Sequence, residues 1–103
     1  MKSLIKLVIV LSITSSMDFA LADYDLFLKN NCAACHYVDK RKYGPMLKEV
    51  AVKYADDPGA EAMLAKKIKA GGAGVWGEDM MPPQAQVSDA DAKALAKYIL
   101  SLK

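Results

Sequence analysis

The sequence Cys32-Ala33-Ala34-Cys35-His36 places two thiols and the only histidine of the chain within one short segment. On a helical turn, residues i, i+3 and i+4 share a face, with Cβ atoms about 5–6 Å apart. Both thiols and the imidazole can therefore point at one flat ligand, and the small Ala33 and Ala34 leave its edge unobstructed. This C-x-x-C-H spacing is the signature of covalent haem attachment, in which Cys32 and Cys35 bond the porphyrin and His36 binds the iron.

Three other uses of the same side chains stay open at this point. A dithiol redox pair of the thioredoxin kind normally lies beside a β-α-β pattern. A zinc site needs a fourth ligand, and the adjacent Cys35 and His36 would have difficulty pointing at one tetrahedral centre. A structural disulfide is favoured in an oxidising compartment. Haem attachment is the interpretation that explains why a histidine directly follows the second cysteine.

The second axial ligand of the iron decides the function, because a five-coordinate haem binds small molecules whereas a six-coordinate haem mostly transfers electrons. With no second histidine in the chain, methionine is the leading candidate. Met46 and Met63 fall on or beside expected helices, where methionine usually fills core space. Met81 precedes Pro82-Pro83, which restricts its backbone to extended conformations. We predict Met81 as the ligand, with Met80 as the substitute.

Three further residues are expected around the haem. The carbonyl of Pro45 could accept the proton of the second ring nitrogen of His36, because ligating histidines nearly always donate that proton. The indole N–H of Trp76 needs an acceptor if it is buried, and a haem propionate would supply one; the alternative is an ordinary core aromatic. Lys67 could help to neutralise a propionate, and a solvated helix face explains this lysine equally well.

Residues 1–22 have the layout of a secretory signal peptide, which we expect to be cleaved after Ala22. Two lysines flank the start, residues 7–11 are continuously apolar, and Ala20-Leu21-Ala22 is a small-x-small site. A membrane anchor is the alternative, but a span needs about 20 mostly apolar residues. Ser, Thr and Asp side chains interrupt this segment early. We therefore expect an exported mature chain, residues 23–103, without a membrane span.

Length and charge exclude several classes of protein. A chain of 103 residues favours one domain, and 14 basic against 12 acidic side chains fall far short of the basic surface of a nucleic-acid-binding protein. Cleavage would leave 81 of the 103 residues. Domains near this size usually need a disulfide, a metal or a cofactor for stability. A bound prosthetic group therefore fits the size of the mature chain, and nucleic acid is not an expected partner.

Apolar residues recur at intervals of three and four along the mature chain and no stretch alternates strictly. This pattern predicts an all-α fold of four to five short helices. The first helix is expected to be capped by Asp23 or Asp25 and to run to about Asn31. The second is expected over residues 47–54.

Two more helices and a long loop are expected in the second half of the chain. Asp57 is expected to cap the third helix, with Pro58 at its first position, where the missing N–H costs nothing. Gly71-Gly72 ends this helix, and a loop rich in Gly and Pro runs from there to about residue 86. Loops of this length in compact domains are usually functional or disordered. Ser88, with an acidic residue three positions later, resembles a capping box for the last helix, in which the apolar residues Ala92, Leu95, Ala96, Ile99 and Leu102 form one stripe.

Taken together, these residues resemble a class I cytochrome c, most closely the short bacterial subgroup of periplasmic monohaem electron carriers. The resemblance covers essentially all of residues 23–103. Its motifs are the haem-attachment segment, Gly44-Pro45, Val75-Trp76-Gly77 with Met81-Pro82-Pro83, and the closing helix from Val87-Ser88-Asp89.

The resemblance implies a helical fold wrapped around one haem, and transient redox partners such as nitrite reductases, terminal oxidases or haem peroxidases. We expect a periplasmic monomer that is not itself an enzyme. The run Lys40-Arg41-Lys42 is either a docking element or a solvated loop. Three positions depart from the usual pattern of the family: Gln84 replaces Asn, Met80 replaces Pro before the ligand, and Lys67 replaces Arg, which loses bidentate geometry.

Overall fold

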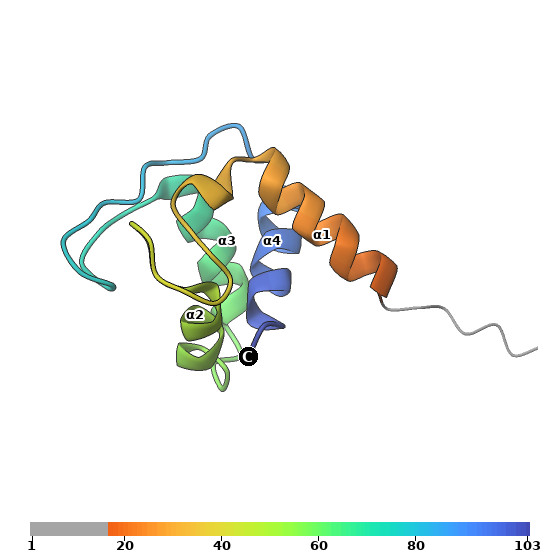
Figure 1. The fold of residues 1–103 in the computed structure, drawn as a ribbon, viewed down its shortest axis with the longest axis horizontal. Helices are drawn as coiled ribbons and strands as arrows, with labels where there is room; N and C mark the ends of the chain where they lie inside the picture. The colour runs from red at the N-terminus through yellow and green to blue at the C-terminus, as the bar shows by residue number, and fades with distance from the viewer. Residues whose placement is uncertain (1–16) are drawn as a thin grey trace, which may run out of the picture.

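Four α-helices and one short 3-10 helix make up the regular structure of the computed structural model, which describes residues 17–103 (Figure 1). In chain order they are α1 (Met17–Lys29), η1 (Cys32–Ala34), α2 (Leu47–Lys53), α3 (Ala60–Ala70) and α4 (Asp89–Leu100). The described part contains no strand, only an isolated antiparallel bridge between Gly72 and Met81. The predicted all-α class is confirmed. None of the described helices has the length and hydropathy needed to cross a membrane.

Helix α1 begins earlier than predicted. It starts at Met17, so neither Asp23 nor Asp25 is its N-cap, and it passes through Ala22, where cleavage is expected. Directly before Asp23, Ala20-Leu21-Ala22 are good helix formers, and no Gly or Pro between Met17 and Asp23 interrupts the helix. Residues 1–16 of the predicted signal peptide lie outside the described residues. At the other end α1 stops at Lys29, and Asn31 adopts the left-handed φ of 61° typical of a helix end.

The start of α3 also differs from the prediction. Its N-cap is Gly59, and Pro58 lies in the preceding turn instead of at the first helical position. The reason is local: an Asp57 carboxylate oxygen accepts a hydrogen bond from the Gly59 N–H at 2.8 Å. This Asx-type turn keeps Asp57 and Pro58 out of the helix. By contrast, Ser88 caps α4 as predicted, its hydroxyl accepting from the Asp91 N–H at 3.1 Å.

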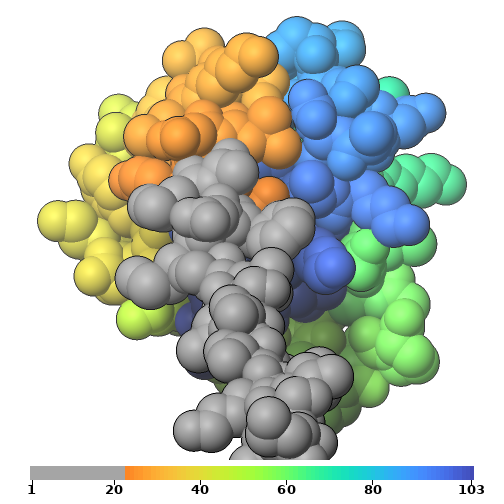
Figure 2. Space-filling model, turned by 90° about the vertical axis from the view of Figure 1, so that its right-hand side faces the viewer, coloured from red at the N-terminus to blue at the C-terminus, as the bar shows by residue number. Residues whose placement is uncertain are grey.

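Helix α4 forms the centre of the core. It packs against α1, α2 and α3, and its residues Ala92, Leu95 and Ala96 are buried. The predicted apolar stripe is therefore right, with Ile99 and Leu102 partly buried at its end. Figure 2 shows α1 (orange) lying beside the C-terminal segment (blue) on one face of the molecule.

A loop of residues 71–88 joins α3 to α4 and contains neither helix nor strand, as predicted. Its ends are held close to α3. Gly72 and Met81 exchange two backbone hydrogen bonds of 2.9 and 2.8 Å, and the Gln84 N–H donates to the Ile68 carbonyl at 3.2 Å. In Figure 1 this loop (teal to light blue) extends away from the helices on the side of α2 and α3.

Candidate haem site

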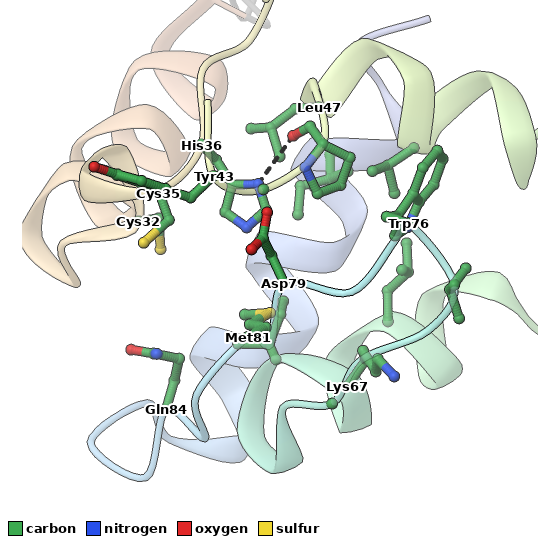
Figure 3. A pocket seen from close by; sticks show the side chains of 18 of the residues that line it. Cys32, Cys35, His36, Tyr43, Leu47, Lys67, Trp76, Asp79, Met81 and Gln84 are labelled. Atoms are coloured by element: carbon green, nitrogen blue, oxygen red, sulfur yellow. Dashed lines mark hydrogen bonds between the residues drawn. The ribbon is translucent and has the colours of Figure 1, made fainter. Parts of the chain in front are cut away.

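The attachment motif adopts the helical turn that its spacing predicts. After α1, the backbone N–H groups of Cys35 and His36 both donate to the carbonyl of Cys32, at 3.2 and 2.9 Å. This geometry brings residues 32, 35 and 36 onto one side of the turn. Cys32 and Cys35 are unpaired and half-buried. Figure 3 shows their sulfur atoms next to each other, with the His36 ring to one side.

The chemistry of Cys32 disfavours a dithiol redox site. Burial raises the pKa of the Cys32 thiol, and the neighbouring Cys35 raises it further, against a backbone hydrogen bond that lowers it. Cys32 therefore keeps its proton at neutral pH. Dithiol oxidoreductases depend on the opposite, a thiolate with a depressed pKa.

The His36 imidazole is fixed in orientation by the loop that follows it. Its Nδ1 lies 3.0 Å from the Pro45 carbonyl oxygen, which is the hydrogen bond expected from the sequence. With the Nδ1 proton donated to that oxygen, Nε2 carries the lone pair that a metal can take. The loop itself is closed by a 2.8 Å hydrogen bond from the Gly44 N–H to the Cys35 carbonyl.

Met81 enters the same pocket from the long loop. The bridge to Gly72 fixes its backbone, which also packs directly on the end of α3: a Cβ on Gly71 would come within 2.3 Å of the Met81 carbonyl oxygen. Met81 is half-buried, whereas the side chain of Met80 is 71% exposed. In Figure 3 Met81 lies on the far side of the pocket from His36, with Asp79 between them.

Gln84 is directed away from the Met81 sulfur. Its side-chain amide donates to the Pro82 carbonyl at 3.0 Å and accepts from the amide of Gln86 at 2.8 Å. Figure 3 shows the Gln84 side chain apart from Met81. The amide that replaces the usual Asn of the resembled family is thus used to stiffen its own loop.

Trp76 and Lys67 border another side of the pocket (Figure 3). The Trp76 side chain packs on the buried cluster of Val50, Leu64 and Ala96, and the Lys53 ammonium lies 5.6 Å from the centre of its ring system. The Lys67 ammonium lies against Gly72, where a Cβ would be only 2.5 Å away. The structure thus brings all seven predicted site residues to one pocket: Cys32, Cys35, His36, Pro45, Lys67, Trp76 and Met81.

The walls of the pocket are apolar, and sequence reasoning did not assign them to the site. They come from all four α-helices and include Phe27, Leu47, Val50, Leu64, Ile68, Leu95 and Ile99. Their helical spacing indicates buried positions, but the same spacing is typical of any helical core. A second omission is Arg41, whose side chain donates to the Trp76 carbonyl. No sequence signal distinguishes Arg41 from its lysine neighbours.

The residues present fit a haem and do not fit zinc. The apolar walls from four helices suit the flat apolar ring of haem, and the two adjacent thiols and the imidazole nitrogen suit its attachment and its iron. The Trp76 and Lys67 side chains at one border suit its acidic propionate groups. Among residues 23–103 no three His, Cys, Asp or Glu side chains form a metal-binding group, so the zinc interpretation has no ligand set. An all-α fold with this pocket beside a C-x-x-C-H turn defines a small c-type haem protein.

The comparisons with known proteins agree with that class. The family model for cytochrome c matches residues 24–103, and the chain belongs to this family. It is 59% identical to cytochrome c-552 of Nitrosomonas europaea over 85 residues, 82% of each chain. It is 53% identical to cytochrome c-551 of Pseudomonas aeruginosa over 78 residues, 76% of this chain and 74% of the other.

A solved structure shows the same fold. The crystal structure of wild-type Nitrosomonas europaea cytochrome c552 superposes with a TM-score of 0.77 at 59% identity, covering 78% of this chain and 99% of that one. The chain is therefore a small class I bacterial cytochrome c, an electron carrier of the family that holds haem c covalently through a cysteine pair.

Proposed function

We propose that this chain is a periplasmic one-electron carrier in which His36 and Met81 are the two axial ligands of a single haem iron, with Cys32 and Cys35 as the thioether attachment points. When bound, the haem supplies a reversible Fe(III)/Fe(II) couple, whose potential a His–Met ligand pair raises. With His36 and Met81 both bound to the iron, a substrate would have no free coordination position. The work of the protein is then electron transfer and not catalysis.

One observation carries the proposal: hydrogen bonds to the protein backbone position both candidate ligands in the same pocket. Nδ1 of His36 is committed to the Pro45 carbonyl, which leaves Nε2 as the metal-binding atom. The backbone of Met81 is held by two hydrogen bonds to Gly72. A thioether binds iron weakly, so a methionine whose backbone is held in the pocket by hydrogen bonds is favoured over one whose backbone is not. Met80, exposed and outside this bridge, lacks that support.

Trp76 and Lys67 are proposed as the residues that hold the propionate groups. The Trp76 indole would donate a hydrogen bond and the Lys67 ammonium would neutralise charge. Lys53, whose ammonium lies over the Trp76 ring, adds a second positive charge near this border. A propionate beside Trp76 would therefore be stabilised as the anion.

Localisation and partners follow from the predicted signal peptide over residues 1–22 and from the family. Export to the periplasm would bring the mature chain, residues 23–103, to the compartment in which it docks transiently with other redox proteins. Nitrite reductases, terminal oxidases and haem peroxidases are the partner classes proposed, and the carrier is proposed to act as a monomer.

The paired variants Met81→Ala and Met80→Ala test the ligand assignment. Met81→Ala should keep its haem, because the thioether bonds do not depend on the sixth ligand. It should bind carbon monoxide in the reduced state and have a lower reduction potential. Met80→Ala should match the natural protein in both properties. Carbon monoxide binding by Met80→Ala, with Met81→Ala unchanged, would reverse the assignment.

The natural protein separates the proposal from its rivals in the same experiment. A natural protein that already binds carbon monoxide would point to a five-coordinate sensor or small-ligand enzyme. A natural protein that incorporates no haem would instead favour a dithiol oxidoreductase that uses Cys32 and Cys35 as a redox pair.

A further inference from the structure

We propose that Arg41 is a positioning residue that fastens the outer part of the ligand loop, residues 73–80, across the border of the haem pocket. This inference rests on the proposed function, because its effect on the iron acts through Met81, which directly follows residues 73–80. We refer to residues 73–80 as the outer loop.

The contact joins two segments that are far apart in the sequence. The Nη2 group of Arg41 donates to the Trp76 carbonyl oxygen at 3.1 Å. The same nitrogen lies 3.6 Å from the position that a Cβ on Gly77 would take. The guanidinium therefore lies along the backbone of residues 76 and 77, and a Cβ at position 77 would be in van der Waals contact with it.

The outer loop has little other support. Every residue in it except Trp76 is exposed, with Val75 at 50% and Met80 at 71%. Its one internal backbone hydrogen bond runs from the Gly74 N–H to the Gly77 carbonyl at 3.0 Å. Among residues 23–103, the Arg41 contact is the only hydrogen bond from another segment to the outer loop. Trp76 therefore holds the outer loop in two ways: its indole packs against the core, and its carbonyl accepts the hydrogen bond from Arg41.

Arg41 itself projects from a segment whose two ends are joined by backbone hydrogen bonds. The N–H groups of Leu47 and Lys48 donate to the carbonyls of Tyr37 and Val38, at 3.0 and 3.1 Å, which closes the segment at its base. Within this closed segment lies Pro45, the partner of His36. Arg41 therefore connects the segment that orients one proposed iron ligand with the loop that leads to the other.

The two flanking lysines provide a matched comparison. The ammonium groups of Lys40 and Lys42 lie 5.0 and 5.1 Å from the centre of the Tyr37 ring. All three side chains carry one positive charge on the same exposed segment. Only Arg41 makes the hydrogen bond to Trp76. Comparison with a lysine variant therefore separates the effect of this hydrogen bond from the effect of removing one positive charge.

Release of Met81 from the iron requires the loop before it to move. If the Arg41 hydrogen bond must break before the outer loop can move, the loop opens less often. The net free energy of a typical hydrogen bond corresponds to a factor of about two to ten. Arg41→Gln should therefore bind an added ligand such as imidazole faster by that factor, because binding to oxidised protein must wait for Met81 to leave.

The test compares haem-loaded Arg41→Gln, Arg41→Lys and Lys42→Gln with the natural protein. At about pH 8 imidazole is mostly neutral, and Lys42→Gln removes the same charge as Arg41→Gln, so an effect of surface charge alone would appear in both variants. Faster binding in Arg41→Gln, partial recovery in Arg41→Lys and no change in Lys42→Gln would support the fastening role. Equal rates in Arg41→Gln and Lys42→Gln would overturn it.

A second readout does not depend on the iron ligand. Amide hydrogen exchange at Gly74, whose N–H donates to the Gly77 carbonyl, reports how often the outer loop opens. Exchange there should be faster by a similar factor in Arg41→Gln and unchanged in Lys42→Gln. If the natural protein binds imidazole without waiting for a ligand to leave, the assignment of Met81 fails. The exchange rates then still decide whether Arg41 fastens the loop.

Discussion

At residue 44 only glycine is compatible with the observed position of His36. A Cβ built there would come within 2.3 Å of Cε1 and 2.6 Å of Nδ1 of the imidazole. Gly44→Ala must therefore push the ring away from the Pro45 carbonyl or displace the loop. We expect a loss of about 1–3 kcal/mol in the free energy of unfolding of the haem-loaded protein, the usual cost of overpacking. Urea denaturation followed by circular dichroism measures it.

Gly59→Ala is the control for this substitution. At position 59 the nearest atom to a new Cβ is a carboxylate oxygen of Asp57 at 3.4 Å, and φ is −92°, which alanine adopts freely. Its free energy of unfolding should fall by less than that of Gly44→Ala, because only the lower preference of alanine for the N-cap of α3 is involved. A Gly44→Ala variant as stable as Gly59→Ala would show that the ring does not occupy the position described.

Single residues also show how far the sequence predicts the site. A motif with fixed spacing predicts the two thiols and His36. The contact with Pro45 follows from the second ring proton of a ligating histidine, and the structure brings all of these residues to one pocket. Arg41 could not be predicted, because its partner is a backbone carbonyl 35 positions away. The direction of Gln84 depends in the same way on which neighbouring carbonyl its amide reaches.

At the scale of elements, a surface ion pair links α3 to the start of α4. The Lys69 ammonium contacts the Asp89 carboxylate, and its hydrogen bond and charge lower the pKa of that carboxyl. A lowered pKa in the folded state means that the pair stabilises the fold above the ordinary pKa of aspartate, about 3.9. That stability is lost as the pH falls through the folded-state value. The effect is small, because the Asp89 side chain is 92% exposed.

Asp89→Asn should accordingly lower the free energy of unfolding near pH 7, and its difference from the natural protein should shrink as the pH falls below about 4. Asp91→Asn is the matched control, since it removes the same charge from the same first turn of α4 without touching the Lys69 pair. Denaturation at several pH values measures both variants. Equal losses in the two variants at pH 7 would contradict a specific role for the pair.

The helices themselves were predictable in kind and number, and the errors lie at their starts. The apolar stripe of α4 and its cap at Ser88 match, because both depend on residues within a few positions of each other. The start of α3 was misplaced because Asp57 can cap a helix or form a turn, and here its hydrogen bond to Gly59 selects the turn. The start of α1 was misplaced because the segment before Asp23 favours a helix as well.

At the scale of the whole molecule, the pocket and the core share the same side chains. Phe27, Leu47, Ile68 and Leu95 belong to one buried cluster and also line the pocket. A haem bound there completes the core of a mature chain that is otherwise small for independent stability. The double variant Cys32→Ser, Cys35→Ser, produced without haem, should therefore lose most of its helical circular dichroism and its cooperative thermal transition.

The haem-loaded natural protein is the reference for that experiment. A haem-free variant with the same helical signal and the same melting temperature would show that the helices pack without the cofactor. That result would contradict the claim that haem completes the hydrophobic core.

The most direct test of the central claim, ligation of one haem by His36 and Met81, is the visible and near-infrared spectrum of the haem-loaded protein. It is recorded oxidised, then reduced, then under carbon monoxide. We predict sharp low-spin bands, a weak iron–sulfur charge-transfer band in the oxidised state, and no response to carbon monoxide. A high-spin spectrum that shifts when carbon monoxide is added would contradict the claim.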